Sequence, residues 1–238
     1  YRHGIRTLLP LPRARAWRGG LLVHVRPRIA QLLSARGERG GRGGQRPGHE
    51  VRDSHRWTSN DAFSSGMEQH ATNHHEGHKG DLELPTRVYR IDGNTGDATV
   101  VDDMLEKPNG LAFSPDFKIL YVSDTGVSHK PGHPRQIHAF DVTDQHGLTN
   151  HRVFCDLGAA VPDGFRVDVD GNIWSSAGWA GAAEDGVHVY APDGDKIGAI
   201  HTPEGISNLC FGGEKRNRLL MTGSQSIYSL YTEAQGMP

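Results

Sequence analysis

Cysteine is scarce in this chain, whose 238 residues include only Cys155 and Cys210. Two cysteines form one disulfide at most, and neither lies in a Cys-x-x-Cys or Cys/His spacing typical of structural zinc sites. A scaffold held by several disulfides and a zinc finger are therefore excluded. We expect both cysteines to be small hydrophobic side chains buried in the core.

Long apolar runs are also missing, and the mean hydropathy is -0.57. The apolar stretches near the start, at 8–12 and 20–25, are short and lie among Arg and Pro residues. A membrane-spanning helix needs about 20 apolar residues, so neither stretch qualifies, and neither resembles the core of a signal peptide. The sequence predicts a soluble protein without a membrane partner, either cytoplasmic or exported.

Lysine is absent from the first 78 residues, although residues 1–52 contain twelve Arg against two acidic residues. The stretch 36–48 consists only of Gly, Arg, Glu, Gln and Pro, which cannot build a core. Residues 1–75 are therefore atypical: out-of-frame sequence, a disordered basic arm, or a divergent part of the fold. Because the arginines lack interleaved aromatics that stack on bases, nucleic acid is not favoured as a partner.

Helical periodicity is missing from about residue 76 onward. The apolar residues instead alternate with period two in short segments separated by Gly, Asn and Asp, which is typical of β-hairpins. The sequence predicts strands at 87–92, 98–101, 136–142, 152–156, 186–190, 196–201 and 226–231. We therefore expect an all-β fold.

A Pro-x-Gly triplet occurs three times, each time ahead of two apolar segments separated by a turn. The triplets begin at Pro108, Pro162 and Pro203, and each unit continues into one of the predicted hairpins. Four strands per unit match a β-propeller blade better than a β-sandwich or a helical solenoid. At about 40–45 residues per blade, the roughly 160 patterned residues predict nearly four blades.

The middle residues of the triplets carry oxygen atoms in all three units: Asn109, Asp163 and Glu204. Because the innermost strands of neighbouring blades line one channel, we expect these side chains to meet at one of its mouths. Amide and carboxylate oxygens are suitable ligands for a hard divalent cation. The alternative is that the triplets are ordinary turns. The absence of a Gly-x-Ser-x-Gly motif argues against a serine esterase.

The ordered set of motifs resembles bacterial gluconolactonases of the senescence marker protein/gluconolactonase/regucalcin family. The matching segments are 76–79, 88–92, 108–116, 120–126, 162–168, 171–174 and 208–213. The resemblance covers about residues 76–236 and implies a six-bladed β-propeller in the family. Here residues 76–238 would form an incomplete propeller portion after an irregular region at 1–75, in which we find no counterpart of the family's glutamate metal ligand.

The resemblance also implies an activity, the metal-dependent hydrolysis of a sugar lactone to the hydroxy acid, and hence a carboxylic ester hydrolase. Asn109 and Asp163 would bind one divalent cation (Ca, Zn, Mg or Mn), and Asp163 would act as the catalytic general base. From the repeat alone, Glu204 is a candidate for contacting the sugar at the channel mouth. Trp179 either lines the sugar site or packs in the core, and Asp124 is either a nearby carboxylate or a turn residue. The alternative is a non-catalytic propeller that binds calcium or a protein partner.

Overall fold

The computed structural model describes residues 6–10, 62–65 and 85–238, the first two segments by their strand pairing alone. These residues form β-strands joined by turns, with one short 3-10 helix, η1 (Gly126–Ser128). The predicted all-β fold is confirmed. In the described part of the chain, no helix is long and apolar enough to cross a membrane.

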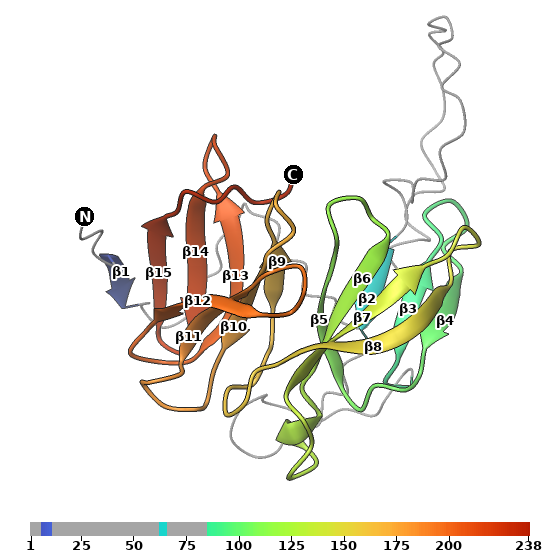
Figure 1. Ribbon diagram of the computed structural model, residues 1–238, viewed down its shortest axis with the longest axis horizontal. Coiled ribbons are helices and arrows are strands. Elements are labelled where there is room, and N and C mark those ends of the chain that lie inside the picture. The colour runs from blue at the N-terminus through green and yellow to red at the C-terminus, as the bar shows by residue number, and fades with distance from the viewer. Residues whose placement is uncertain (1–5, 11–61, 66–84) are drawn as a thin grey trace, which may run out of the picture.

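The described strands form four antiparallel sheets, which we call blades 1 to 4 (Figure 1). Blade 1 contains β2 (Ala62–Ser65), β3 (Val88–Ile91) and β4 (Ala98–Asp102). Blade 2 contains β5 (Pro108–Phe113), β6 (Ile119–Asp124), β7 (Gln136–Val142) and β8 (Leu148–Asp156). Blade 3 contains β9 (Phe165–Val167), β10 (Ile173–Ala177), β11 (Gly186–Tyr190) and β12 (Lys196–His201). Blade 4 contains β13 (Ile206–Gly212), β14 (Arg218–Gly223), β15 (Ser226–Tyr231) and β1 (Arg6–Pro10).

Two strands from the beginning of the chain complete sheets formed by later segments. β1 pairs antiparallel with β15, with Arg6 opposite Ser229, and β2 pairs with β3, with Ala62 opposite Ile91. Most of the irregular region predicted at 1–75 lies outside the described residues. The two of its segments that the structure describes are both strands.

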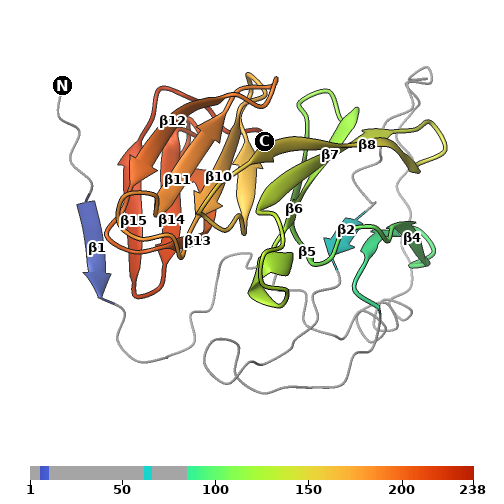
Figure 2. The same cartoon turned by 60° about the horizontal axis from the view of Figure 1, so that its bottom comes forward.

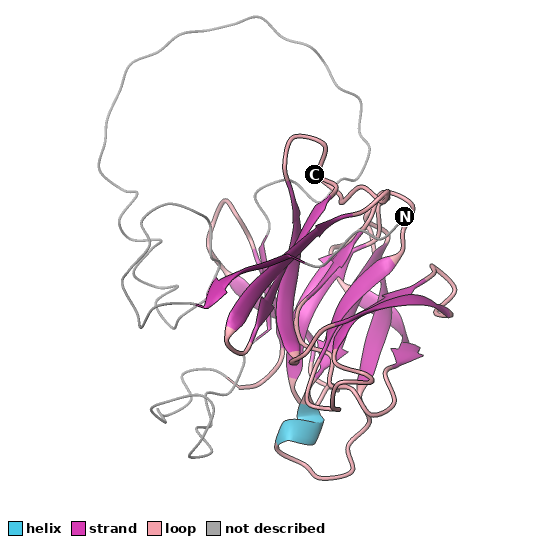
Figure 3. Ribbon diagram, turned by 90° about the vertical axis from the view of Figure 1, so that its left-hand side faces the viewer, coloured by secondary structure: helices cyan, strands magenta, loops and turns pink. Residues whose placement is uncertain are grey.

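The innermost strands of blades 2, 3 and 4 are β5, β9 and β13, and β9 contacts both of the others. These three strands run in the same direction, so their first residues lie together at one end of the molecule. We call this the η1 end because η1 lies there, and we call the opposite end the C-terminal end (Figures 1 and 3). The blades stand next to one another, and the innermost strands of blades 2 to 4 share this common direction (Figure 2).

The hydrophobic core consists of three clusters of buried side chains, each lying between two successive blades. Leu120 and Phe140 of blade 2 pack with Val88 of blade 1. A second cluster joins blades 2 and 3, and a third joins blades 3 and 4 through residues such as Val187 and Leu209. Because burying each such side chain contributes about 1.5–3 kcal/mol, the blades are stabilised mainly by their neighbours.

Two sequence predictions need correction. The strand expected at 152–156 begins earlier, at Leu148, because a tight turn follows β7, with a hydrogen bond of 2.9 Å from Thr143 N to Gly147 O. Cys155 is buried as expected, but Cys210 is exposed. Since side chains alternate along a strand, Cys210 faces away from the core that its neighbour Leu209 enters.

Candidate functional site at the η1 end

The structure places the three Pro-x-Gly triplets at the η1 end, where the innermost strands begin. Asn109 is the second residue of β5, whereas Asp163 and Glu204 lie just ahead of β9 and β13. All three residues are partly buried. The expectation that the repeat brings these positions to one end of the fold agrees with this placement.

The Asn109 and Asp163 turns are in direct contact. The hydroxyl of Ser123, near the end of β6, accepts a hydrogen bond of 2.8 Å from Gly110 N and donates one of 2.8 Å to the carbonyl oxygen of Asp163. A Cβ atom on Gly110 would lie 2.3 Å from that same oxygen. Glycine is therefore required at this position, because any side chain would push the two turns apart.

The Asp163 turn is also fixed within blade 3 and against blade 4. Asp163 N donates to the hydroxyl of Ser176 at 3.1 Å, and Gly164 N donates to the carbonyl of Ser207 at 2.9 Å. Ser123 and Ser176 occupy equivalent positions on the second strands of their blades. The sequence reasoning missed both serines, although their shared position in the repeat was a usable signal.

The carboxylate of Glu204 forms its hydrogen bonds within blade 4. Its two oxygens accept from the hydroxyl of Tyr228 and from Gln225 N, both at 2.9 Å. Burial, together with the Glu204 carboxylate, raises the pKa of the Tyr228 hydroxyl. This geometry ties Glu204 to the turn between β14 and β15.

Trp179 lies at the same end, in the loop that follows β10. Its side chain is 57% exposed and its backbone has a φ of 59°, in the left-handed region. A Cβ atom on Gly205 would lie 3.1 Å from Trp179 N, so this loop packs against the Glu204 turn. An exposed indole next to the triplets offers an apolar surface to a ligand.

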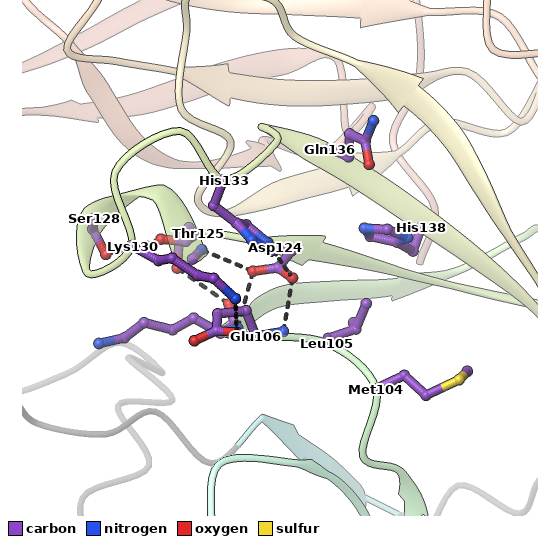
Figure 4. Close-up of polar contacts among 12 residues, drawn as sticks. Met104, Leu105, Glu106, Asp124, Thr125, Ser128, Lys130, His133, Gln136 and His138 are labelled. Carbon is purple, nitrogen blue, oxygen red and sulfur yellow. Dashed lines mark hydrogen bonds and ion pairs between the residues drawn. The ribbon is translucent and has the colours of Figure 1, made fainter.

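Asp124 organises a loop at the η1 end (Figure 4). Its buried carboxylate accepts hydrogen bonds from the backbone nitrogens of Glu106, Lys107 and Gly126 at 2.8–2.9 Å. The imidazole Nε2 of His133 lies 3.1 Å from the same carboxylate. Of the two roles open to Asp124, this network supports that of a turn residue, because the carboxylate already has four donors.

The triplet side chains at the η1 end carry oxygen atoms as their potential metal ligands. Among the described residues, no group of three or more His, Cys, Asp and Glu side chains could hold a metal ion. Asn109 contributes an amide oxygen and Asp163 a carboxylate. By donor type, these two side chains suit a hard cation and do not suit a thiolate or multi-histidine site.

Residues 52–225 match the family model described as the SMP-30/gluconolactonase/LRE-like region. The chain therefore belongs to this family, and its blades are those of a β-propeller. The match includes all the motif segments between residues 76 and 213, begins earlier than the expected resemblance at 76–236 and ends at residue 225.

Relatives with known names agree with the family assignment. The chain is 31% identical to the lactonohydrolase oryH of Aspergillus oryzae over 61% of its own length and 34% of that protein. A gluconolactonase structure from Xanthomonas campestris is 36% identical, with a TM-score of 0.56, over 66% of this chain and 48% of that one. The calcium-binding protein regucalcin from Agrobacterium tumefaciens shares the fold, at 23% identity and a TM-score of 0.53, over 63% of this chain and 54% of that one. The chain thus spans about a third to a half of the length of these proteins.

Proposed function

We propose that this protein hydrolyses a sugar lactone to the corresponding hydroxy acid at the η1 end. The observation that carries the proposal is that the hydroxyl of Ser123 bridges the Asn109 and Asp163 turns by hydrogen bonds to both. The contact joins the backbones of the two turns that carry the Asn109 amide and the Asp163 carboxylate. The names of the lactonohydrolase and gluconolactonase relatives support the same reaction class.

Asn109 and Asp163 are the residues that would hold a divalent cation, since both provide hard oxygen ligands. When bound, the cation would supply Lewis acidity toward the lactone carbonyl. We place the cation among Ca, Mg, Mn and Zn. The calcium-binding regucalcin neighbour supports the first of these.

Asp163 is the proposed general base, which takes a proton from the water that attacks the lactone carbonyl. Its turn is fixed by Ser123 on one side and Ser176 on the other, so the carboxylate starts from a rigid frame. We propose that the indole of Trp179 packs against the face of the sugar ring. Glu204 would contact the sugar from the blade 4 side, positioned by Tyr228.

The test is acid release from gluconolactone by the purified chain, with each of the four cations added in turn. Asp163→Ala is expected to lower the rate by about 100-fold or more, because a positioned base contributes about 10²–10⁴-fold. Asn109→Ala is expected to raise the cation concentration needed for half-maximal rate. Asp193→Ala, an exposed aspartate on the outer turn of blade 3, is the matched control and is expected to keep the full rate.

Two outcomes would contradict lactone hydrolysis at this site. The first is turnover that survives Asp163→Ala in a folded sample. The second is a folded chain that binds calcium, loses that binding with Asn109→Ala, and never exceeds the spontaneous rate of ring opening. The second outcome would support the alternative of a calcium-binding propeller without catalysis.

A further inference from the structure

A cavity of about 300 Å³ opens at the C-terminal end of the innermost strands, opposite the Asn109 and Asp163 turns. Its walls come from the last residues of β5, β9 and β13 and from the end of the chain. Most of the walls are apolar: Phe113, Phe117, Val167, Phe211 and Met237. The cavity is therefore suited to an apolar body of limited size.

One cationic side chain, Arg166 of β9, lines this apolar cavity. Nη1 of Arg166 donates a hydrogen bond of 2.7 Å to the carbonyl of Phe165. The residue as a whole is exposed to solvent, although the surrounding protein desolvates the guanidinium enough to lower its pKa. Among the described residues, no carboxylate forms an ion pair with Arg166. A guanidinium has five donors in a planar fork, and the remaining donors match a carboxylate in geometry and charge.

The ring of Phe117 lines the cavity, and the backbone of Phe117 is conformationally strained. It has a φ of 60°, in the left-handed region, where a bulky side chain is strained by about 1–2 kcal/mol. The equivalent turn of blade 3 has Gly171 at this position, with a φ of 87°. Phe117 thus occupies a glycine position, and its ring lies 5.9 Å from that of Phe113 at the cavity wall.

We propose that this cavity binds a small carboxylate with an apolar body, such as an aryl or alkyl acid. The carboxylate would pair with Arg166, and the body would lie between Phe117 and the end of β13. A sugar acid or inorganic phosphate fits poorly, because the apolar walls would strip water from its hydroxyls or oxygens without replacing the hydrogen bonds. This site is separate from the proposed lactone site and does not depend on it.

Cys210 also lines the cavity and serves as a reporter of occupancy. Cys155 is buried, and burial raises the pKa of its thiol to about 12, so a thiol reagent modifies Cys210 in the folded chain. The experiment measures the rate of Cys210 modification in the full chain with increasing phenylacetate. Phenylacetamide, which has the same shape without the charge, is the matched control, and gluconate is the polar acid.

Phenylacetate is expected to slow the modification of Cys210 in a saturable manner, whereas phenylacetamide and gluconate leave the rate unchanged. Arg166→Gln is expected to raise the half-protective concentration at least tenfold, and Phe117→Gly to raise it several-fold. Titration calorimetry with the same three compounds measures binding directly. It also covers the case of a ligand that binds without shielding the thiol.

Three results would overturn the proposal. One is equal binding of phenylacetate and phenylacetamide, which would leave no role for the guanidinium. Another is binding of gluconate in place of phenylacetate, and the third is no calorimetric binding of any of the three compounds to the wild-type chain. These comparisons on the wild-type chain decide the question even if Arg166→Gln fails to fold.

Discussion

Blades 2 and 3 each place a histidine at the same position of their third strand. His138 of β7 and His188 of β11 both follow a fully buried aliphatic residue, and each is followed two positions later by a buried aromatic, Phe140 or Tyr190. Both imidazoles are buried, with His138 8% and His188 1% exposed. The repeated frame therefore fixes where the ring lies.

The partners of the two rings differ. His138 Nδ1 lies 2.9 Å from Nε2 of His151, and burial, with a smaller effect from His151, lowers the pKa of His138 to about 4. His188 Nε2 lies 2.9 Å from the carbonyl of Glu184, its Nδ1 has no hydrogen-bond partner among the residues that the structure describes, and burial lowers the pKa of His188 too. The comparison teaches that burial lowers the histidine pKa in both blades, whereas the hydrogen-bond partners of the ring are specific to each blade.

The same two blades also build their first turn differently. In blade 3, the fully buried carboxylate of Asp168 accepts from the indole Nε1 of Trp174 at 2.9 Å, from the amide of Asn172 and from two backbone nitrogens. In blade 2, the exposed Asp116 accepts from the Ser114 hydroxyl at 2.7 Å. Equivalent turns thus depend on one buried carboxylate in blade 3 and on a local contact in blade 2.

Removing the two turn carboxylates is expected to give the largest difference between the blades. Asp168→Ala leaves several buried donors without an acceptor and is expected to lower the free energy of unfolding by about 3 kcal/mol or more. Asp116→Ala is expected to cost less than about 1 kcal/mol. Urea unfolding of both variants measures the difference, and equal losses would show that the two turns are equivalent.

Acidification tests the shared property of the two histidines. The folded pKa of His138 lies below its unfolded value of about 6.5, so its stabilising contribution is present above pH 6.5 and is lost as the pH falls toward 4. Between pH 7 and pH 5 this residue alone is expected to cost about 2 kcal/mol of unfolding free energy. His138→Gln and His188→Gln should each flatten the pH dependence of urea unfolding, and an unchanged slope would contradict neutral burial.

The left-handed turn position gives the smallest expected difference. Gly171→Ala introduces a side chain at a φ of 87° and is expected to cost about 1–2 kcal/mol. Phe117→Gly relieves strain but loses ring contacts and gains chain entropy when unfolded, so we expect a change within about 0.5 kcal/mol. Thermal unfolding of the pair measures this contrast. A large loss for Phe117→Gly would mean that the ring stabilises the fold as well as lining the cavity.

The sequence predicted the blade pattern well because each strand carries its own alternation and each unit repeats the order of turn and strand. It also predicted that the positions of Asn109, Asp163 and Glu204 lie at one end, since equivalent positions of parallel innermost strands must share an end. These features depend on residues close together in the chain.

Features that depend on contacts between distant segments were not predictable. The Glu204 carboxylate accepts a hydrogen bond from Tyr228, which lies on β15, 24 residues later in the chain. The exposure of Cys210 depends on which face of β13 the neighbouring blade covers, and alternation alone does not choose that face. The cavity around Arg166 needs the ends of three innermost strands and the end of the chain together.

The pairing of β1 with β15 has a consequence for how the protein is made. Because β15 follows β1 only after the strands of blades 1 to 3 have been synthesised, β1 has no pairing partner during that interval. An unpaired strand edge favours intermolecular pairing during that interval. Closing blade 4 is therefore a late and slow event with high contact order, and the yield of native protein should depend on how well the nascent β1 is kept from other chains.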